Sequence, residues 1–151
     1  MKPNLFKQKL AQGQMPVGHM LVQFNTRGIA KILEAAGVDF AVIDMEHGPG
    51  SERDTRGQLQ ALARTGTSAL VRLEATERPR YSRALDLGAS GVLVPRINSV
   101  EDAEEAAENC RYSGNRGVAR YNRSWSWGLD TRGLENADAA VVCAVQVETE
   151  G

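Results

Sequence analysis

The sequence predicts an α/β fold with parallel strands. Five short apolar runs alternate along the chain with stretches whose apolar residues recur at helical spacing. Strands that are apolar throughout are typical of parallel sheets buried on both faces. Five such strands fit either an open doubly wound sheet or part of a (β/α)8 barrel. No glycine-rich phosphate-binding pattern follows the first run, which disfavours a dinucleotide-binding sheet.

The apolar runs are the predicted strands. They occupy residues 17–24, 40–44, 69–72, 91–95 and 141–147. Each is short enough for a buried strand and is flanked by residues that favour turns or helix ends. The polar stretch at residues 112–133 is predicted to form a long loop before the last strand.

Helices are predicted between the strands from apolar periodicity and from residues that start or stop a helix. Gly37 and Gly88 are predicted C-terminal stops, and Ser51 is a predicted N-cap. Ser99 with Asp102 approximates a capping box. In chain order the predicted helices cover residues 4–11, 26–36, 51–64, 79–87 and 99–111.

The composition is that of an ordinary globular domain. The chain has 151 residues, of which 42% are hydrophobic and 25% charged, so it can form one domain with a real core and is not globally disordered. Its net charge of -1 gives no reason to expect nucleic acid or an anionic membrane as a partner. No apolar run approaches the roughly 20 residues of a membrane span, and no secretory signal is recognisable at the N-terminus.

The two cysteines indicate a reducing compartment. Cys110 and Cys143 are far apart in the sequence and belong to no paired motif. This pattern fits a cytoplasmic protein better than a disulfide-stabilised one. Each cysteine is expected to fill space in the core and not to act as a nucleophile.

Polar residues that could take part in catalysis or metal binding fall at the ends of four predicted strands. In parallel α/β folds, active residues gather at the carboxyl ends of the strands. We therefore expect an acid, a base, a cation and a metal ligand to meet on one rim. The residues at these ends are Asp44, Glu46 and His47, then Arg72, then Arg96, and finally Gln146 and Glu148.

Each of these residues also has a simpler interpretation. Asp44 could bind backbone amides in its turn, and His47 could serve only to satisfy a loop. Arg72 could form a surface pair with Glu74 or Glu77, and Glu148 could be solvated. Trp125 and Trp127 are expected to anchor the long loop. Because such polar residues fall at the ends of four strands and not of one alone, the functional interpretation is favoured.

Several segments resemble one enzyme family. Residues 39–49, DFAVIDMEHGP, resemble the signature of the HpcH/HpaI aldolases, metal-dependent pyruvate aldolases that include hydroxy-oxo-heptanedioate and deoxy-glucarate aldolases. Residues 87–103, LGASGVLVPRINSVEDA, Val71-Arg72 and residues 145–149, VQVET, also match in the family's order. The resemblance implies a (β/α)8 TIM barrel, of which residues 1–151 would be the N-terminal portion with about five strands.

The resemblance also implies a role for individual residues. The implied reaction is metal-dependent cleavage or formation of a carbon–carbon bond in a 2-oxo acid, with pyruvate as one partner. A homo-oligomer is expected. By resemblance, His47 would be the base that takes a proton from pyruvate, Asp86 would raise the basicity of His47, Arg72 would stabilise developing charge, Gln146 would contact substrate, and Glu148 would bind the metal.

The chemistry accounts for these residue types. A metal chelated by the keto and carboxylate oxygens of pyruvate spreads the charge of the enolate, and a nearby arginine adds electrostatic stabilisation. Oxygen ligands favour Mg²⁺ or Mn²⁺, with Co²⁺ as a further option. No lysine stands at a recognisable strand end, which argues against a Schiff-base aldolase.

Two departures from the family pattern affect the expectation. The family has a second carboxylate ligand after the next strand, whereas this sequence ends at Gly151, and a full barrel has about 250 residues. Residues 111–117, RYSGNRG, lack the prolines of the family's RYPP-type loop. We therefore expect the N-terminal part of an aldolase barrel, with a noncatalytic, self-associating remnant as the alternative.

Overall fold

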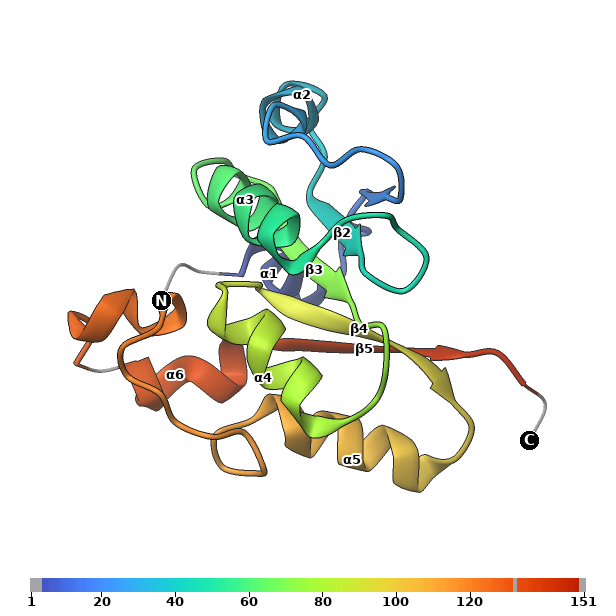
Figure 1. Ribbon diagram of the computed structural model, residues 1–151, viewed down its shortest axis with the longest axis vertical. Helices are drawn as coiled ribbons and strands as arrows, with labels where there is room; N and C mark the ends of the chain where they lie inside the picture. Colours follow the sequence, from blue (N-terminus) through green and yellow to red (C-terminus); the bar gives the residue numbers. More distant parts are fainter. Residues whose placement is uncertain (1–3, 132, 150–151) are drawn as a thin grey trace.

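The computed structural model describes residues 4–131 and 133–149, and its centre is one sheet of five parallel strands (Figure 1). The strands lie in chain order across the sheet, and each pairs with its neighbours in parallel. A doubly wound sheet would reverse its strand order, so this order identifies the first part of a (β/α)8 barrel. The strands are β1 (Gly18–Leu21), β2 (Phe40–Asp44), β3 (Ser68–Arg72), β4 (Gly91–Ile97) and β5 (Val142–Val147).

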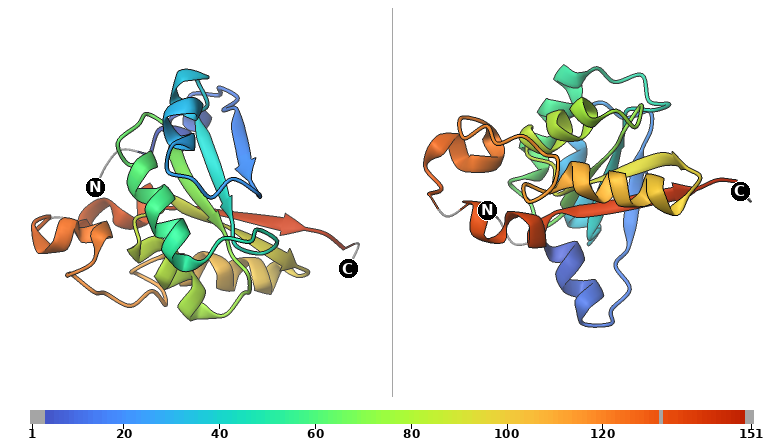
Figure 2. Two further views of the ribbon diagram at one scale, coloured as in Figure 1. Left: turned by 45° about the horizontal axis from the view of Figure 1, so that its top comes forward. Right: turned by 90° about the horizontal axis from the view of Figure 1, so that it is seen from below.

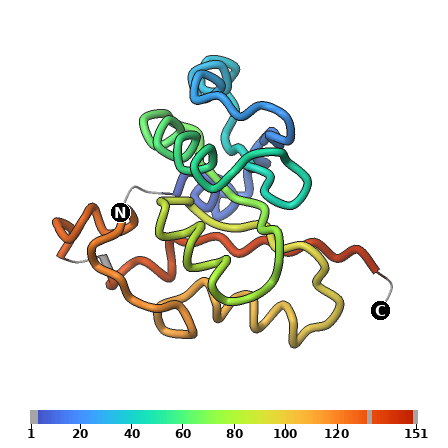
Figure 3. Tube along the Cα trace, viewed as in Figure 1, coloured from blue at the N-terminus to red at the C-terminus, as the bar shows by residue number. Residues whose placement is uncertain are grey.

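The helices alternate with the strands along the chain, as the continuous trace shows (Figure 3). Ser51 and Ser99 each start a helix with a complete capping box, in which an aspartate takes the place usually held by glutamate. The helices are α1 (Leu5–Ala11), α2 (Ile29–Ala35), α3 (Glu52–Leu62), α4 (Arg78–Asp86), α5 (Val100–Cys110), the 3-10 helix η1 (Arg123–Gly128) and α6 (Gly133–Ala140).

Two apolar clusters lie on opposite faces of the sheet. Alternate residues of each strand, such as Ala41 and Ile43 of β2, pack against α2 to α5 in the larger, outer cluster. The intervening residues, such as Val42, join Leu70 and Val142 in a smaller cluster on the inner face. The outer cluster also holds both cysteines, which are free thiols as predicted.

The inner face is closed at the amino ends of the strands by α1, which lies across the sheet from α3 and α4 (Figure 2). Phe6 of α1 packs edge-on against Phe40 of β2, with 4.8 Å between ring centroids. Asn4 caps this helix and donates through Nδ2 to the carbonyls of Ser90 (3.0 Å) and Ala140 (2.9 Å). Helix α1 does not cover the carboxyl ends of the strands.

The predicted elements are confirmed except around the long loop and at two strand ends. Helix η1 lies within the stretch predicted to be a long loop, and α6 lies between that loop and the last predicted strand, where the sequence predicts no element. The predicted strand at 17–24 is limited to β1, whereas β4 continues past Pro95 through an irregularity between Val94 and Ile97. No helix among the described residues is long and apolar enough to cross a membrane.

Candidate active site

The carboxyl ends of β2 and β3 are joined by a buried ion pair. Arg72 donates to both carboxylate oxygens of Asp44, from Nε at 2.8 Å and from Nη2 at 2.6 Å. The side chains are 11% and 0% exposed, respectively. Two parallel N–H···O bonds fix the plane of the guanidinium, which is the strong geometry for this pair. Arg72 therefore pairs with Asp44 and not, as the simpler interpretation had it, with Glu74 or Glu77 at the surface.

Asp44 also organises the turn after β2. Its Oδ1 accepts from the backbone N–H groups of Glu46 (3.0 Å) and His47 (3.3 Å), so its expected role as a turn residue is confirmed. Burial by itself raises the pKa of Asp44, but the bonds from Arg72 and from these two amides together hold it below its usual value. A Cβ atom on Gly48 would overlap the carbonyl oxygen of Asp44, so the turn requires glycine there.

Glu46 lies between two arginines on this rim. Its Oε2 is 3.3 Å from Nη1 of Arg72, and its Oε1 is 3.5 Å from Nη2 of Arg96. Oε2 is buried without a hydrogen-bond partner among the described residues. A carboxylate that is close to two cations but not fully bonded can accept a further hydrogen bond or cation.

Arg96 connects the ends of β4 and β5. Its φ of 56° lies in the left-handed region, where a residue with a side chain is strained. In that conformation its backbone N–H donates to Oε2 of Glu148 at 3.2 Å. Thr149 and Asn98 add a side-chain hydrogen bond of 2.8 Å between the same two strand ends. The irregularity in β4 therefore fixes the position of Glu148.

Gln146 lies on the inner face of β5, two residues before Glu148. Val142 and Ala144 belong to the inner cluster, and the alternation of a strand places Gln146 on the same face. Its Oε1 is buried without a hydrogen-bond partner among residues 4–131 and 133–149. An unsatisfied buried acceptor on this face is suited to a donor from a ligand or from ordered water.

The structure brings four of the five predicted site residues to one rim. Arg72, Gln146 and Glu148 lie at strand ends, and His47 is in the turn after β2 with a side chain that is 69% exposed. Nε2 of His47 is 3.9 Å from Oε2 of Glu46. The sequence places Glu46 and Arg96 at the same strand ends without a specific role for either, and the structure brings both to the rim beside Arg72 or Glu148.

Asp86 is the fifth predicted residue, and the structure does not bring it to the rim beside His47, so its expected support of His47 stays a prediction. Asp86 ends α4, before the start of β4, whereas His47 follows the end of β2. Parallel strands place these positions at opposite ends of the sheet, separated by the length of a strand. Asp86 instead accepts a hydrogen bond of 2.9 Å from Nη2 of Arg116, and Arg116 is nearly fully buried.

The rim offers part of a cation site. Glu148 and Glu46 supply carboxylate oxygens, which suit Mg²⁺ or Mn²⁺. No group of three or more His, Cys, Asp or Glu side chains in the described part of the chain is arranged to hold a metal ion. These residues therefore fit a portion of an oxygen-ligand set and not a complete one.

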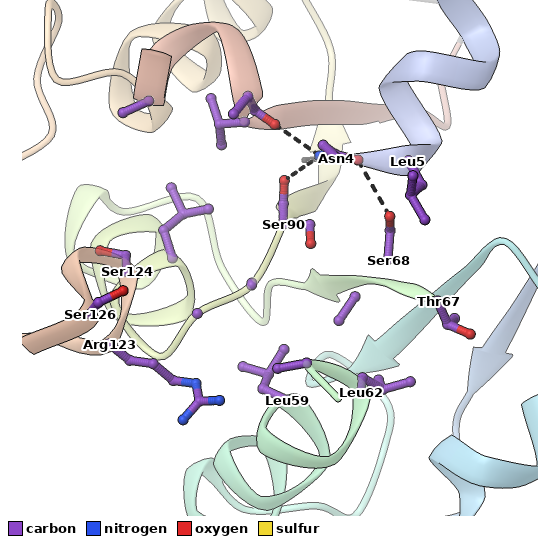
Figure 4. Close-up of a pocket in the computed structure, with 18 of the residues that line it drawn as sticks. Asn4, Leu5, Leu59, Leu62, Thr67, Ser68, Ser90, Arg123, Ser124 and Ser126 are labelled. Atoms are coloured by element: carbon purple, nitrogen blue, oxygen red, sulfur yellow. Dashed lines mark hydrogen bonds between the residues drawn. The ribbon is translucent and has the colours of Figure 1, made fainter. Parts of the chain in front are cut away.

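A separate cavity of about 250 Å³ lies at the other end of the sheet. Figure 4 shows Asn4, Ser68 and Ser90 in its wall, joined by the hydrogen bonds that hold α1 in place. Leu59 and Leu62 of α3 form an apolar part of the lining. Because it faces the amino ends of the strands, this cavity does not include the rim residues.

Comparison with known proteins agrees with this geometry: the chain belongs to the HpcH/HpaI aldolase/citrate lyase family, whose model matches residues 19–151. It is 36% identical over 151 residues to the 4-hydroxy-2-oxovalerate aldolase of Rhodococcus jostii RHA1, covering 97% of this chain and 57% of that enzyme. It is 31% identical over 150 residues to the 2-keto-3-deoxy-L-rhamnonate aldolase of Escherichia coli K12, covering 97% of this chain and 56% of that enzyme.

Solved structures show the same fold. A family member from Burkholderia cenocepacia J2315 superposes with a TM-score of 0.89 at 35% identity, over 97% of this chain and 60% of that one. The HpcH/HpaI aldolase of Desulfitobacterium hafniense DCB-2 gives a TM-score of 0.87 at 27% identity, over 97% and 57%. The chain thus has the first part of a TIM-barrel aldolase and spans little more than half the length of these relatives.

Proposed function

We propose that the rim is part of the active site of a metal-dependent aldolase that cleaves or forms a carbon–carbon bond in 2-oxo acids, with pyruvate as one partner. The observation that carries the proposal is the fixed Arg72 guanidinium at the strand ends, beside Glu46 and on the same rim as His47 and Glu148. Arginine held in this way can stabilise negative charge that develops on a substrate oxygen without having to reorganise.

Each rim residue has a distinct role in this proposal. His47, which is exposed to solvent, takes the proton from the methyl group of pyruvate and returns it in the reverse direction. Arg72 stabilises the enolate oxygen, and Asp44 positions Arg72. Gln146 donates a hydrogen bond to the substrate through its amide nitrogen or accepts one through its unsatisfied Oε1.

Glu148 would be a metal ligand, with the backbone N–H of Arg96 holding one of its oxygens. The cation, Mg²⁺ or Mn²⁺, would polarise the oxygens of the 2-oxo acid when bound. No group of three or more His, Cys, Asp or Glu side chains forms around it within the described residues. A titration of metal binding by calorimetry, comparing the chain with Glu148→Gln, tests the contribution of this carboxylate without depending on turnover.

The activity is best tested in a chimera that joins residues 1–151 to the remaining part of the R. jostii aldolase. We expect pyruvate release from a 4-hydroxy-2-oxo acid in the presence of Mg²⁺ or Mn²⁺. His47→Ala should slow exchange of the pyruvate methyl protons by roughly 10²–10⁴-fold, the usual effect of losing a general base.

His19→Ala is the matched control, because His19 is the other histidine of the chain and lies exposed on β1. It should leave proton exchange unchanged. A folded chimera without pyruvate release from any hydroxy-oxo acid would overturn the proposed reaction. Normal exchange in His47→Ala would exclude His47 as the base.

A noncatalytic, self-associating role is the second candidate. The strands β1 and β5 are the two edges of the sheet, and β5 exposes Val145 and Val147. An exposed apolar edge is a template for pairing with another chain. Concentration-dependent assembly of the 151-residue chain, together with an inactive chimera, would favour this role. A homo-oligomer is compatible with both candidates.

A further inference from the structure

A cationic groove lies on the helical side of the molecule, apart from the rim. It has a volume of about 620 Å³ and runs between α3, α4 and residues 117–127. We call it the arginine groove, after the four arginines that line it. They are Arg56 of α3, Arg78 and Arg83 of α4, and Arg123 of η1.

The groove has little negative charge of its own. Asp86 is the one carboxylate in its lining, and it is already paired with Arg116, whose side chain is 3% exposed. Arg83 forms an ion pair of 3.0 Å with Glu52, but both side chains are about half exposed, and such pairs contribute little. Arg56 and Arg123 have no ion pair within the described residues. The lining therefore carries excess positive charge.

Contacts within and beside the groove hold two of the arginines in place. Nη1 of Arg78 donates to the carbonyl of Asn115 at 3.2 Å. The guanidinium of Arg123 lies 5.5 Å from the ring centre of Trp127. The stem of Arg123 also passes close to the backbone of Gly88, where a Cβ atom would be 3.0 Å from Cδ. Side chains that are already ordered lose less entropy when they bind a ligand.

Two further donors in the lining lack partners. Oγ of Ser82 and Nδ2 of Asn122 are buried and have no hydrogen-bond partner among the described residues. Guanidinium, amide and hydroxyl groups all donate, so the complementary ligand is an anion with several acceptor oxygens. Pro79, Leu87 and Trp127 add apolar surface beside these donors.

We propose that the arginine groove binds a small molecule that carries a phosphate group. Arginine binds phosphate oxygens in a bidentate manner and is weakly hydrated, so several guanidinium groups around one groove favour this anion. The volume is in the range of small-molecule sites. The net charge of -1 and the small extent of the groove distinguish this site from a nucleic-acid surface. The proposal does not depend on the aldolase reaction.

The test is a calorimetric titration of the 151-residue chain with inorganic phosphate, ribose 5-phosphate and AMP. We expect saturable binding of at least one of them, weakened by added salt. Arg56→Gln and Arg123→Gln should each weaken it by about tenfold or more, as expected for a lost hydrogen bond to a charged group. Tighter binding of the two esters than of inorganic phosphate would show that the organic part contributes as well.

Arg53→Gln is the matched control, because Arg53 is exposed on α3 but outside the groove. It should bind like the unchanged chain. Circular dichroism identifies variants that fail to fold, and either groove variant alone suffices for the comparison. The proposal is overturned if none of the three probes binds saturably, if both groove variants bind as the control does, or if only long polyphosphate binds.

Discussion

Arg72 and Asp44 join two neighbouring strands through two hydrogen bonds at the point where both strands reach the rim. The two residues are also direct partners in the register of β2 and β3. One ion pair thus fixes the end of the sheet and holds the guanidinium to which we assign a role in the proposed reaction. Its contribution to stability can be measured apart from that role.

Arg72→Ala should lower the free energy of unfolding by about 3–5 kcal/mol, because it leaves the carboxylate of Asp44 buried without its partner. The measurement is urea unfolding followed by circular dichroism. Arg53→Ala removes an exposed arginine and should change stability by no more than about 0.5 kcal/mol. Equal losses in the two variants would show that the buried pair contributes nothing specific.

Stability should also depend on pH through Asp44. Because the folded state holds the pKa of Asp44 below its usual value, its contribution is present above the pKa of the unfolded chain, about 4. It is lost as the pH falls through the lower, folded pKa. Unfolding free energies measured from neutral pH into this acidic range should therefore decline, and the decline should be shallower in Asp44→Asn. A parallel decline in both proteins would assign the effect to other carboxyl groups.

Gly91→Ala tests the close approach of β4 and β5. A Cβ atom at residue 91 would overlap the carbonyl oxygen and Cβ of Val142, its partner in the register. Overpacking of this kind typically costs about 1–3 kcal/mol, and urea unfolding would measure it. Gly66→Ala is the control, since nothing lies within 4 Å of a Cβ atom there. If Gly91→Ala is as stable as the control, β4 and β5 do not approach closely at residue 91.

The sequence predicts best those elements in which the residues' own preference for strand or helix agrees with the burial of their side chains. Residues 40–44 form β2 as predicted because every position suits a buried strand, and the inner and outer faces are both covered there. Ser51 and Ser99 start helices because their side chains satisfy exposed amides at the first turn. These causes act within a few residues, so a sequence pattern can reveal them.

What the sequence misses depends on contacts between distant residues. The left-handed Arg96 is stabilised by Glu148, 52 positions away. Asp86 is drawn to Arg116, 30 positions along the chain, which no local pattern indicates. The apolar residues of helix α6 are mostly small alanines, and the helix is held by Asp138, whose carboxylate accepts from the amides of Tyr112 and Ser113. Resemblance could name Asp86 as a site residue, but only the topology shows which end of the sheet it occupies.

Asp86→Asn should destabilise the chain by about 1–3 kcal/mol, because it leaves the buried guanidinium of Arg116 without its carboxylate. The loop that carries Arg116 should also become more accessible, which limited proteolysis would detect within residues 111–122. Glu104→Gln changes a carboxylate to an amide on the exposed face of α5 and serves as the control. Unchanged stability and cleavage in Asp86→Asn would contradict a structural role for this pair.

Self-association of the 151-residue chain should depend on the edge of β5. Val147 is 73% exposed on this strand, and a lysine on a strand edge discourages pairing with another chain. Val147→Lys should therefore reduce the average mass that light scattering reports at high protein concentration. Val118→Lys, at an exposed loop position, should have less effect. If both lysines act alike, the effect reflects total charge and not the edge.

The bonds from Asn4 to the carbonyls of Ser90 and Ala140 have a consequence for how the chain folds during synthesis. The second bond spans 136 positions, almost the whole sequence. A ribosome makes protein from the N-terminus at about 5–20 residues per second, so α1 emerges many seconds before its partner in α6. Until α6 has been made, the side chain of Phe6 lacks its final neighbours. Among the described helices α1 is therefore made first, yet it cannot form all of its contacts until α6 has been made.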